Sequence, residues 1–346
     1  MAAAISDAMK KEKGVTMRVL PTGTDISRMS VIRLHRAHFA AVGMGLYMAQ
    51  EGVYDFGTRD WGPQPIRVAV TNWAKAGMIY MTAKDANIKT WADSKGKRFA
   101  WIPGYAAANV IGTAMLAFAG LTWKDVVKVD LPSFGAAGKA VVDGKVDAAC
   151  CATYSAFNYE LAASPRGIHY PPLTHNDEAG WARVLAVAPY YAKMMCTDGA
   201  QLDAAHPYEG GTYPNSNVIF YSDTDAELVY NVTKLYQELY PVYSKSNAPG
   251  ITGYALNEIK PYFSWAVPFH EGAIRYYKEA GAWTAENDKN NQKMLERQRV
   301  LQEAWDQAII QSSEQKVIDA NFPKFWMTMR QKALEKAGLP VVYYPE

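Results

Sequence analysis

The chain has 346 residues and a mass of 38.3 kDa, which exceeds the size at which one hydrophobic core usually keeps growing, so we expect two lobes. Its 36 Lys and Arg residues against 34 Asp and Glu residues leave a formal charge of +2 without long single-sign runs, which excludes the electrostatic footprint of a nucleic-acid-binding protein. No window approaches the roughly 18 uninterrupted apolar residues of a membrane-spanning helix, so we expect no direct membrane insertion.

The first 83 residues are predicted to alternate between helices and strands. The N-terminus does not have the pattern of a signal peptide and instead predicts the last turns of an amphipathic helix, with Ile5 and Met9 on one face. The elements expected next are a strand at 16–21, a helix at 27–39, a strand at 39–45, and a pair of buried strands at 66–73 and 77–83.

Residues 89–152 continue the alternation. Helices are expected at 109–122 and 133–145, each ended by a glycine, and strands at 126–132 and 146–152. Strands that alternate with helices of this length favour a mostly parallel sheet covered by helices. Residues 171–214 are rich in His, Gly and Asp, and we interpret them as an irregular connection between the lobes.

The last third is predicted to be helix-rich. A strand at 215–222 and a helix at 223–240 come before it, and a charged amphipathic helix covers 289–310. We expect this helix to cap its own lobe rather than to bind a partner, although the pattern alone allows both.

Two of the three cysteines, Cys150 and Cys151, are adjacent in the apolar run VDAACCA, and the third is Cys196. Neighbouring residues of a strand point to opposite faces, so the pair does not form one dithiol site, and adjacent cysteines rarely bond to each other. We therefore predict buried, unreactive thiols rather than a reactive or metal-binding pair. No cofactor, metal site or catalytic constellation stands out, because the six histidines lack a metal-ligand spacing and neither GxSxG nor a P-loop occurs.

Three segments together resemble the TAXI-type substrate-binding receptors of tripartite (TRAP) transporters. The segments are IKTWADSKGKRFAWIPG with the following AGLTWKDV, then LPSFGAAGKAVVDGKVDAACCATYSA, and then VPFHEGAIRYYKEAGAW, with a weaker match at GGTYPN. The resemblance spans roughly residues 16–283 in the family's order. It implies a two-lobed α/β type II periplasmic-binding-protein fold, to which the chain adds a helical C-terminal extension, and it implies a periplasmic receptor that closes on a small ligand and delivers it to a membrane permease.

This resemblance sets the expected domains: lobe 1 from 1–83 plus 214–346, and lobe 2 from 84–213. Compared with the family pattern, the sequence starts inside the first helix, so we expect lobe 1 to lack the family's first strand. The family's hydroxyl-rich loop is replaced by Ala106, Ala107 and Ala108, and its QSD turn by 43–45. Since these changes remove polar donors and the chain is rich in Tyr and Trp, we expect a ligand that is more apolar than a small dicarboxylate.

Candidate ligand-binding residues follow from the resemblance and from the rule that binding groups gather at the carboxyl ends of strands and at helix N-termini. Six of them have a plainer alternative. Thr22, Thr24 and Asp25 could simply cap a helix, Trp73 could pack in the core, and Tyr105 and Asn109 could lie in a surface loop. The set is Thr22, Thr24, Asp25, Trp73, Tyr105, Asn109, Phe134, Tyr154 and Tyr213.

The sequence therefore predicts a monomeric, non-enzymatic solute receptor for a small organic acid or amino-acid-like ligand. The main alternative is an enzyme on the same fold that acts on a small heterocyclic metabolite of the pyrimidine-precursor or futalosine-pathway type. A membrane-anchored sensor is a third alternative, which the missing membrane span and output domain disfavour.

Overall fold

The computed structural model describes residues 1–246 and 248–342, which form two compact units. Unit 1 comprises Met1–Thr24, Trp73–Pro214 and Pro241–Gly253, and unit 2 comprises Asp25–Asn72, Asn215–Tyr240 and Tyr254–Glu346. The α/β class and the two-lobed organisation predicted for a type II periplasmic-binding fold are confirmed, and so is the helical C-terminal extension.

The structure divides the chain at different positions from the predicted lobes 1–83 plus 214–346 and 84–213. The chain passes from unit 2 into the main segment of unit 1 between Asn72 and Trp73, earlier than the predicted boundary between residues 83 and 84, because strand β3 (Met78–Ala83) pairs with two strands of unit 1. Residues 1–24 also belong to unit 1, as does the short segment Pro241–Gly253.

Unit 1 is built on a five-stranded sheet with the order β5-β4-β6-β3-β7. The remaining strands are β4 (Arg98–Trp101), β5 (Val127–Asp130), β6 (Ala148–Ala152) and β7 (Ile168–His169). Only β5, β4 and β6 are parallel, whereas β3 runs antiparallel to both β6 and β7. The predicted mostly parallel sheet is therefore limited to these three strands. Of β5 and β6, only β6 has the continuous burial expected for a sheet covered on both faces. Strand β5 is largely exposed.

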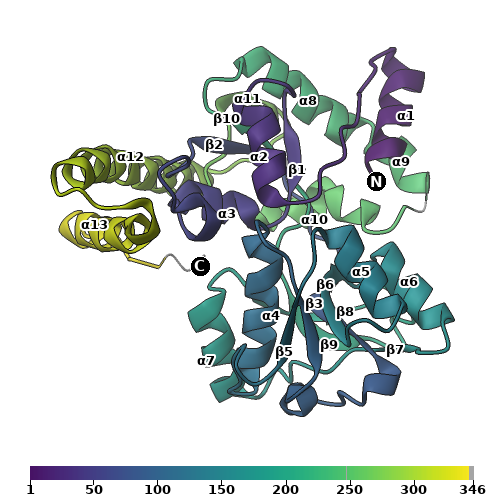
Figure 1. Cartoon of the computed structure of the whole chain (residues 1–346). Helices are drawn as coiled ribbons and strands as arrows, with labels where there is room; N and C mark the ends of the chain where they lie inside the picture. Colours follow the sequence, from purple (N-terminus) through teal and green to yellow (C-terminus); the bar gives the residue numbers. More distant parts are fainter. Residues whose placement is uncertain (247, 343–346) are drawn as a thin grey trace. The chain divides into compact units, whose positions relative to one another are not determined.

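Helices cover this sheet, with α4 and α7 side by side and α5 next to α6 (Figure 1). The helices of unit 1 are α1 (Ala2–Lys13), α4 (Ala106–Phe118), α5 (Phe134–Val142), α6 (Ala156–Ala163) and α7 (Glu178–Val187). In α1, the predicted face with Ile5 and Met9 is buried. The glycines predicted to end α4 and α5, Gly120 and Gly144, follow these helices with positive φ angles of 71° and 75°.

Two predictions for unit 1 are wrong. Residues 16–21 form no strand, because no described segment pairs with them and side chains such as Val19 and Leu20 are exposed. Residues 171–214 are not an irregular connection, since they contain α7 and the hairpin of β8 (Ala192–Cys196) and β9 (Tyr208–Thr212). The tyrosines and glycines of this region obscured its periodicity.

Unit 2 contains a three-stranded antiparallel sheet with the order β1-β10-β2. The strands are β1 (Ala40–Val42), β2 (Ile66–Val70) and β10 (Asn217–Tyr221). Its helices are α2 (Asp25–Arg33), α3 (Gly45–Glu51), α8 (Ala226–Glu238), α10 (Leu256–Ile259) and α11 (Glu271–Glu279), with the short α9 (Tyr240–Tyr243) at the boundary of the unit. The predicted strands at 39–45 and 66–73 correspond to β1 and β2.

The helical extension consists of α12 (Ala285–Glu314) and α13 (Phe322–Lys336), which form a hairpin (Figure 1). Trp305, Phe322 and Trp326 make its core, and the Trp305 ring lies 4.9 Å from that of Trp326. Trp326 also donates a hydrogen bond of 2.6 Å from Nε1 to the carbonyl of Gly52. The amphipathic helix therefore caps its own unit, as expected. None of the helices in the described part of the chain is long and apolar enough to cross a membrane.

Candidate ligand-binding site

In unit 1 the carboxyl ends of the three parallel strands β4, β5 and β6 share one edge of the sheet. The loops that follow them lead directly into the N-termini of α4, α5 and α6. Binding groups in α/β sheets gather at such an edge. We therefore take the loops 102–105, 131–133 and 153–155 as the core of the candidate site.

Three aromatic side chains form a continuous row along this edge. Tyr105, the N-cap residue of α4, has its ring centroid 6.4 Å from that of Phe134, the first residue of α5. Phe134 in turn lies 6.0 Å from Phe157 of α6 in a T-shaped arrangement. All three rings are half-buried, so part of each aromatic surface is open to solvent.

The loop with Thr22 and Thr24 passes the same edge. A Cβ placed on Gly23 would lie 3.3 Å from the Cβ of Ser133, the residue that caps α5 by accepting a hydrogen bond from the Ala136 N–H. Both threonines are half-buried. Unit 1 thus brings the loop between Thr22 and Thr24 next to Ser133, the residue before Phe134.

Asp25 is placed differently, because it belongs to unit 2 and is the first residue of α2. It is 1% exposed, and its carboxyl group packs against the start of α3, where a Cβ on Gly45 would lie 2.4 Å from Asp25 Cγ. Arg28 Nη1 lies 3.6 Å from Asp25 Oδ1. Glycine at position 45 is therefore what allows α3 to approach this carboxylate.

Asn109 and Trp73 hold backbone in place. The amide group of Asn109 accepts a hydrogen bond of 2.9 Å from the Ile102 N–H and donates one of 2.8 Å to the Ile102 carbonyl, so it fixes the loop before Tyr105. Trp73 is buried, and its backbone N–H donates to the Gly253 carbonyl at 2.8 Å. This bond ties the segment Pro241–Gly253 to unit 1.

Tyr154 and Tyr213 are both buried. Tyr154 packs against Gly250, where an added Cβ would lie 2.8 Å from its ring. Tyr213 meets the rings of Tyr190 and Tyr191 at 5.5 and 5.6 Å. Burial, reinforced by the electrostatic influence of neighbours that include Tyr105, raises the pKa of Tyr213 well above its usual value, so its hydroxyl stays neutral.

The structure therefore places Tyr105, Phe134 and the loop that carries Thr22 and Thr24 at one edge of unit 1 and leaves out Asp25. Thr22, Thr24, Tyr105 and Phe134 are half-buried, whereas Trp73, Asn109, Tyr154 and Tyr213 are buried. Sequence reasoning missed Phe157, Tyr190 and Tyr191. The paired tyrosines of APYYAK, directly before a strand, were the available signal for the last two.

The cysteines next to this edge are buried, as predicted. Cys150, Cys151 and Cys196 are 6%, 2% and 0% exposed, and no disulfide joins them in the described part of the chain. The Cys151 thiol donates a hydrogen bond of 2.5 Å to Asn158 Oδ1. Burial raises the pKa of Cys151 and of Cys196 to about 12 in each case.

These thiols should resist modification in the native protein. Because the thiolate is the reactive form, we expect no reaction of Cys151 or Cys196 with Ellman's reagent at pH 8, and reaction of all three cysteines in 6 M guanidinium chloride. Absorbance at 412 nm measures the released thiol. Reaction of Cys151 or Cys196 within seconds in the native protein, without denaturant, would contradict the prediction.

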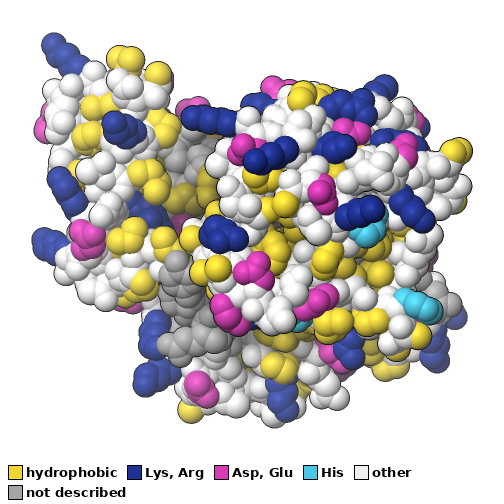
Figure 2. All heavy atoms as spheres, turned by 90° about the horizontal axis from the view of Figure 1, so that it is seen from below, with side chains coloured by type: hydrophobic (Ala, Val, Ile, Leu, Met, Phe, Trp, Pro, Cys, Tyr) yellow, Lys and Arg dark blue, Asp and Glu magenta, His cyan; other side chains and the backbone are white. Residues whose placement is uncertain are grey.

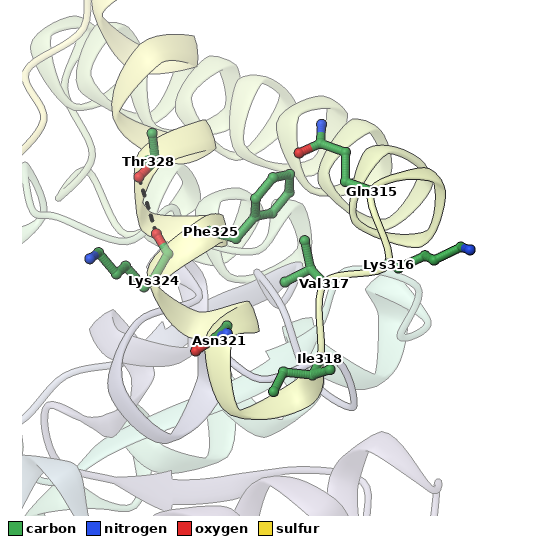
Figure 3. Close-up of a pocket in the computed structure, with 8 residues that line it drawn as sticks. All are labelled: Gln315, Lys316, Val317, Ile318, Asn321, Lys324, Phe325 and Thr328. Atoms are coloured by element: carbon green, nitrogen blue, oxygen red, sulfur yellow. Dashed lines mark hydrogen bonds between the residues drawn. The ribbon is translucent and has the colours of Figure 1, made fainter.

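A surface hollow of about 650 Å³ lies elsewhere, in unit 2. Figure 3 shows it between the end of α12 and the start of α13, with the Phe325 ring at its centre. It contains none of the predicted binding residues. Its lining residues are Gln315, Lys316, Val317, Ile318, Asn321, Lys324, Phe325 and Thr328. On the face shown in Figure 2, Lys and Arg side chains are spread among apolar and acidic ones rather than gathered in one patch.

Several solved structures are similar to this chain. The alkanesulfonate-binding protein SsuA from Xanthomonas axonopodis pv. citri, bound to MOPS, has 14% sequence identity and a TM-score of 0.45, over 87% of this chain and 91% of that one. A binding protein component of an ABC phosphonate transporter from Pseudomonas aeruginosa has 12% identity and a TM-score of 0.44, over 87% and 90%. An arginine-bound amino acid ABC transporter substrate-binding protein from Streptococcus pneumoniae has 14% identity and a TM-score of 0.41, over 73% and 79%.

At the level of sequence families the assignment is direct. The match extends over residues 1–281, which is most of the chain and includes all nine candidate binding residues, and it ends just before the helical extension. By this match, the chain belongs to the NMT1-like family.

Proposed function

We propose that the chain is an extracytoplasmic, periplasmic solute-binding receptor that captures a small organic acid or amino-acid-like molecule. The observation that supports this function best is the edge of unit 1, where a row of half-buried aromatic side chains follows three parallel strands and the loop 22–24 passes next to Ser133. Sites for small molecules are typically built in this way, from apolar and aromatic surface with a few placed polar groups.

The proposed partner is the membrane permease of a TRAP transporter, and the proposed subfamily is the TAXI type. This part of the proposal rests on the three resembling segments in the sequence, which include the loops before α4, α5 and α11. It differs from the transporter class named for two of the solved structures above, which is the ABC class. The receptor would act as a monomer, without a cofactor or a nucleic-acid partner.

A binding receptor releases its ligand chemically unchanged, and this property separates the proposal from the enzyme alternative. We expect the full chain to bind at least one member of a panel of organic acids, amino acids and pyrimidines with one-to-one stoichiometry in isothermal titration calorimetry. After 24 h of incubation with excess protein, mass spectrometry should recover that compound intact. A product of different mass would support the enzyme alternative, and a panel without any saturable binder would contradict the proposed function.

A further inference from the structure

The candidate edge of unit 1 is free of ionic side chains over long stretches of sequence. Residues 102–122, 131–138 and 148–159 cover strand β6, the loops after the three strands, helix α4 and the first turns of α5 and α6, and they contain no Lys, Arg, His, Asp or Glu. The polar groups that these stretches add to the edge are hydroxyls such as those of Ser133 and Tyr105.

A cluster of charged groups lies at the opposite end of the same sheet, while Lys128 and Asp130 of β5 form an ion pair of 3.6 Å, with Lys128 Nζ 4.8 Å from the ring of Trp101, the last residue of β4. Arg98 is the first residue of β4, and its Nη2 donates to Asp147 Oδ1 at 2.6 Å. Asp147 directly precedes β6. Arg166 joins this cluster by contacting Asp85 at 2.8 Å and Asp147 at 3.5 Å. The ionic groups of the Arg98–Asp147–Arg166–Asp85 cluster thus tie loops together at the amino ends of the strands.

The carboxylate of Asp198 also adjoins the edge, near the end of β6. The backbone carbonyl of Asp198 accepts a hydrogen bond of 2.6 Å from Thr153 Oγ1 at the end of β6, and the Asp198 carboxylate accepts one from the Gly250 N–H. Its negative charge would repel each carboxylate of a bound solute, and therefore a dicarboxylate more than a monocarboxylate. The three stretches of the edge therefore offer aromatic surface and hydroxyl groups to a ligand, but no cation.

We propose that the row Tyr105, Phe134 and Phe157 binds the ring of an aromatic carboxylic acid, so that this solute class is preferred over dicarboxylates, acidic amino acids included. Edge-to-face and offset contacts with aromatic rings favour a planar apolar ligand. A second carboxylate would lose its hydration against this surface, and the three stretches supply no cation to pair with it. The inference rests on the proposed receptor function and narrows its ligand.

The test compares ligands on the full chain by isothermal titration calorimetry. Phenylacetate and indole-3-acetate should bind at least about tenfold more tightly than succinate or L-glutamate. Succinate or L-glutamate binding more tightly than both aromatic acids would overturn this inference and leave the receptor function standing. If none of the probes bound, and no compound of the broader panel did either, the receptor function itself would fail.

A pair of variants locates the ring site. Phe134→Leu keeps apolar volume but removes the ring, and it should weaken indole-3-acetate binding by about 3- to 10-fold, whereas Phe134→Tyr should retain the affinity. Phe325→Leu, in the hollow of unit 2, is the matched control and should have no effect. Thermal melting would verify that each variant is folded. Equal affinity of Phe134→Leu and the unmodified chain, or a loss confined to Phe325→Leu, would overturn the assignment.

Discussion

Replacing Glu51 with glutamine should lower the free energy of unfolding of unit 2 by about 3–5 kcal/mol, the usual cost of removing one partner from a buried ion pair. Glu51 ends α3 and is 0% exposed. Arg297 of α12 donates to its two carboxylate oxygens at 2.8 and 2.7 Å, and Arg330 of α13 donates to the same carboxylate and, at 3.2 Å, to the Glu51 carbonyl. The substitution would leave two buried guanidinium groups without a negative charge.

An exposed ion pair on α12 provides the control for Glu51→Gln. Glu303 accepts a hydrogen bond of 2.5 Å from Arg299 Nη1, but both side chains are more than half exposed. Glu303→Gln makes the same chemical change and should alter stability by no more than about 0.5 kcal/mol. Urea unfolding at pH 7, followed by circular dichroism and Trp fluorescence, measures both variants. Equal midpoints for the two variants would show that the buried cluster does not stabilise the extension.

The cluster also sets a pH dependence. Burial raises the pKa of Glu51, but the hydrogen bonds from Arg297 and the charges of both arginines outweigh this effect and hold the pKa below its usual value. A carboxyl group whose pKa is lower in the folded than in the unfolded state stabilises the fold above its unfolded pKa of about 4.3. We therefore expect this contribution to be lost as the pH falls through the lower folded-state pKa, and the difference between the Glu51→Gln variant and the unmodified chain to shrink there.

The sequence was sufficient for elements whose signal is local. The helix stop at Gly120, the buried strand VDAACCA and the amphipathic α12 each follow from a period or a turn residue within a few positions. Residues 16–21 show the limit of this reasoning, because their apolar pattern suits a strand but no described strand pairs with them. A strand is defined by its neighbour, and the local pattern contains no information about that neighbour.

The exposure of a candidate residue could be predicted where it depends on the residue's position just after a strand. It could not be predicted where it depends on contacts with distant parts of the chain. Tyr105 and Phe134 follow strands directly, and the structure leaves both partly open at the edge of the sheet. In contrast, nothing in the sequence around Asn109 indicates that its amide is used up by Ile102. The Glu51–Arg297 pair joins residues 246 positions apart, so only the folded structure reveals it.

Replacing Gly272 with alanine should destabilise unit 2 by about 3 kcal/mol, at the upper end of the usual cost of overpacking. Gly272 lies in the first turn of α11, which packs closely against α8. A Cβ at this position would lie 2.1 Å from the carbonyl oxygen of Ala226 and 2.9 Å from the backbone nitrogen of Tyr230. Because these are backbone atoms of a regular helix, they cannot rotate away, and the two helices would have to separate.

Separation of these helices would also strain the link between α11 and the sheet, since Tyr277 donates from its hydroxyl to the Ala69 carbonyl at 2.9 Å and the His270 N–H donates to the Val68 carbonyl at 2.8 Å. Gly135→Ala in α5 is the matched control, because a Cβ there would meet only Phe157 Cζ, at 4.0 Å. By helix propensity alone, it should stabilise unit 1 by up to about 1 kcal/mol. Calorimetric scans of the two variants should therefore shift in opposite directions. If Gly272→Ala also raised the melting temperature, the close contact between α8 and α11 would be refuted.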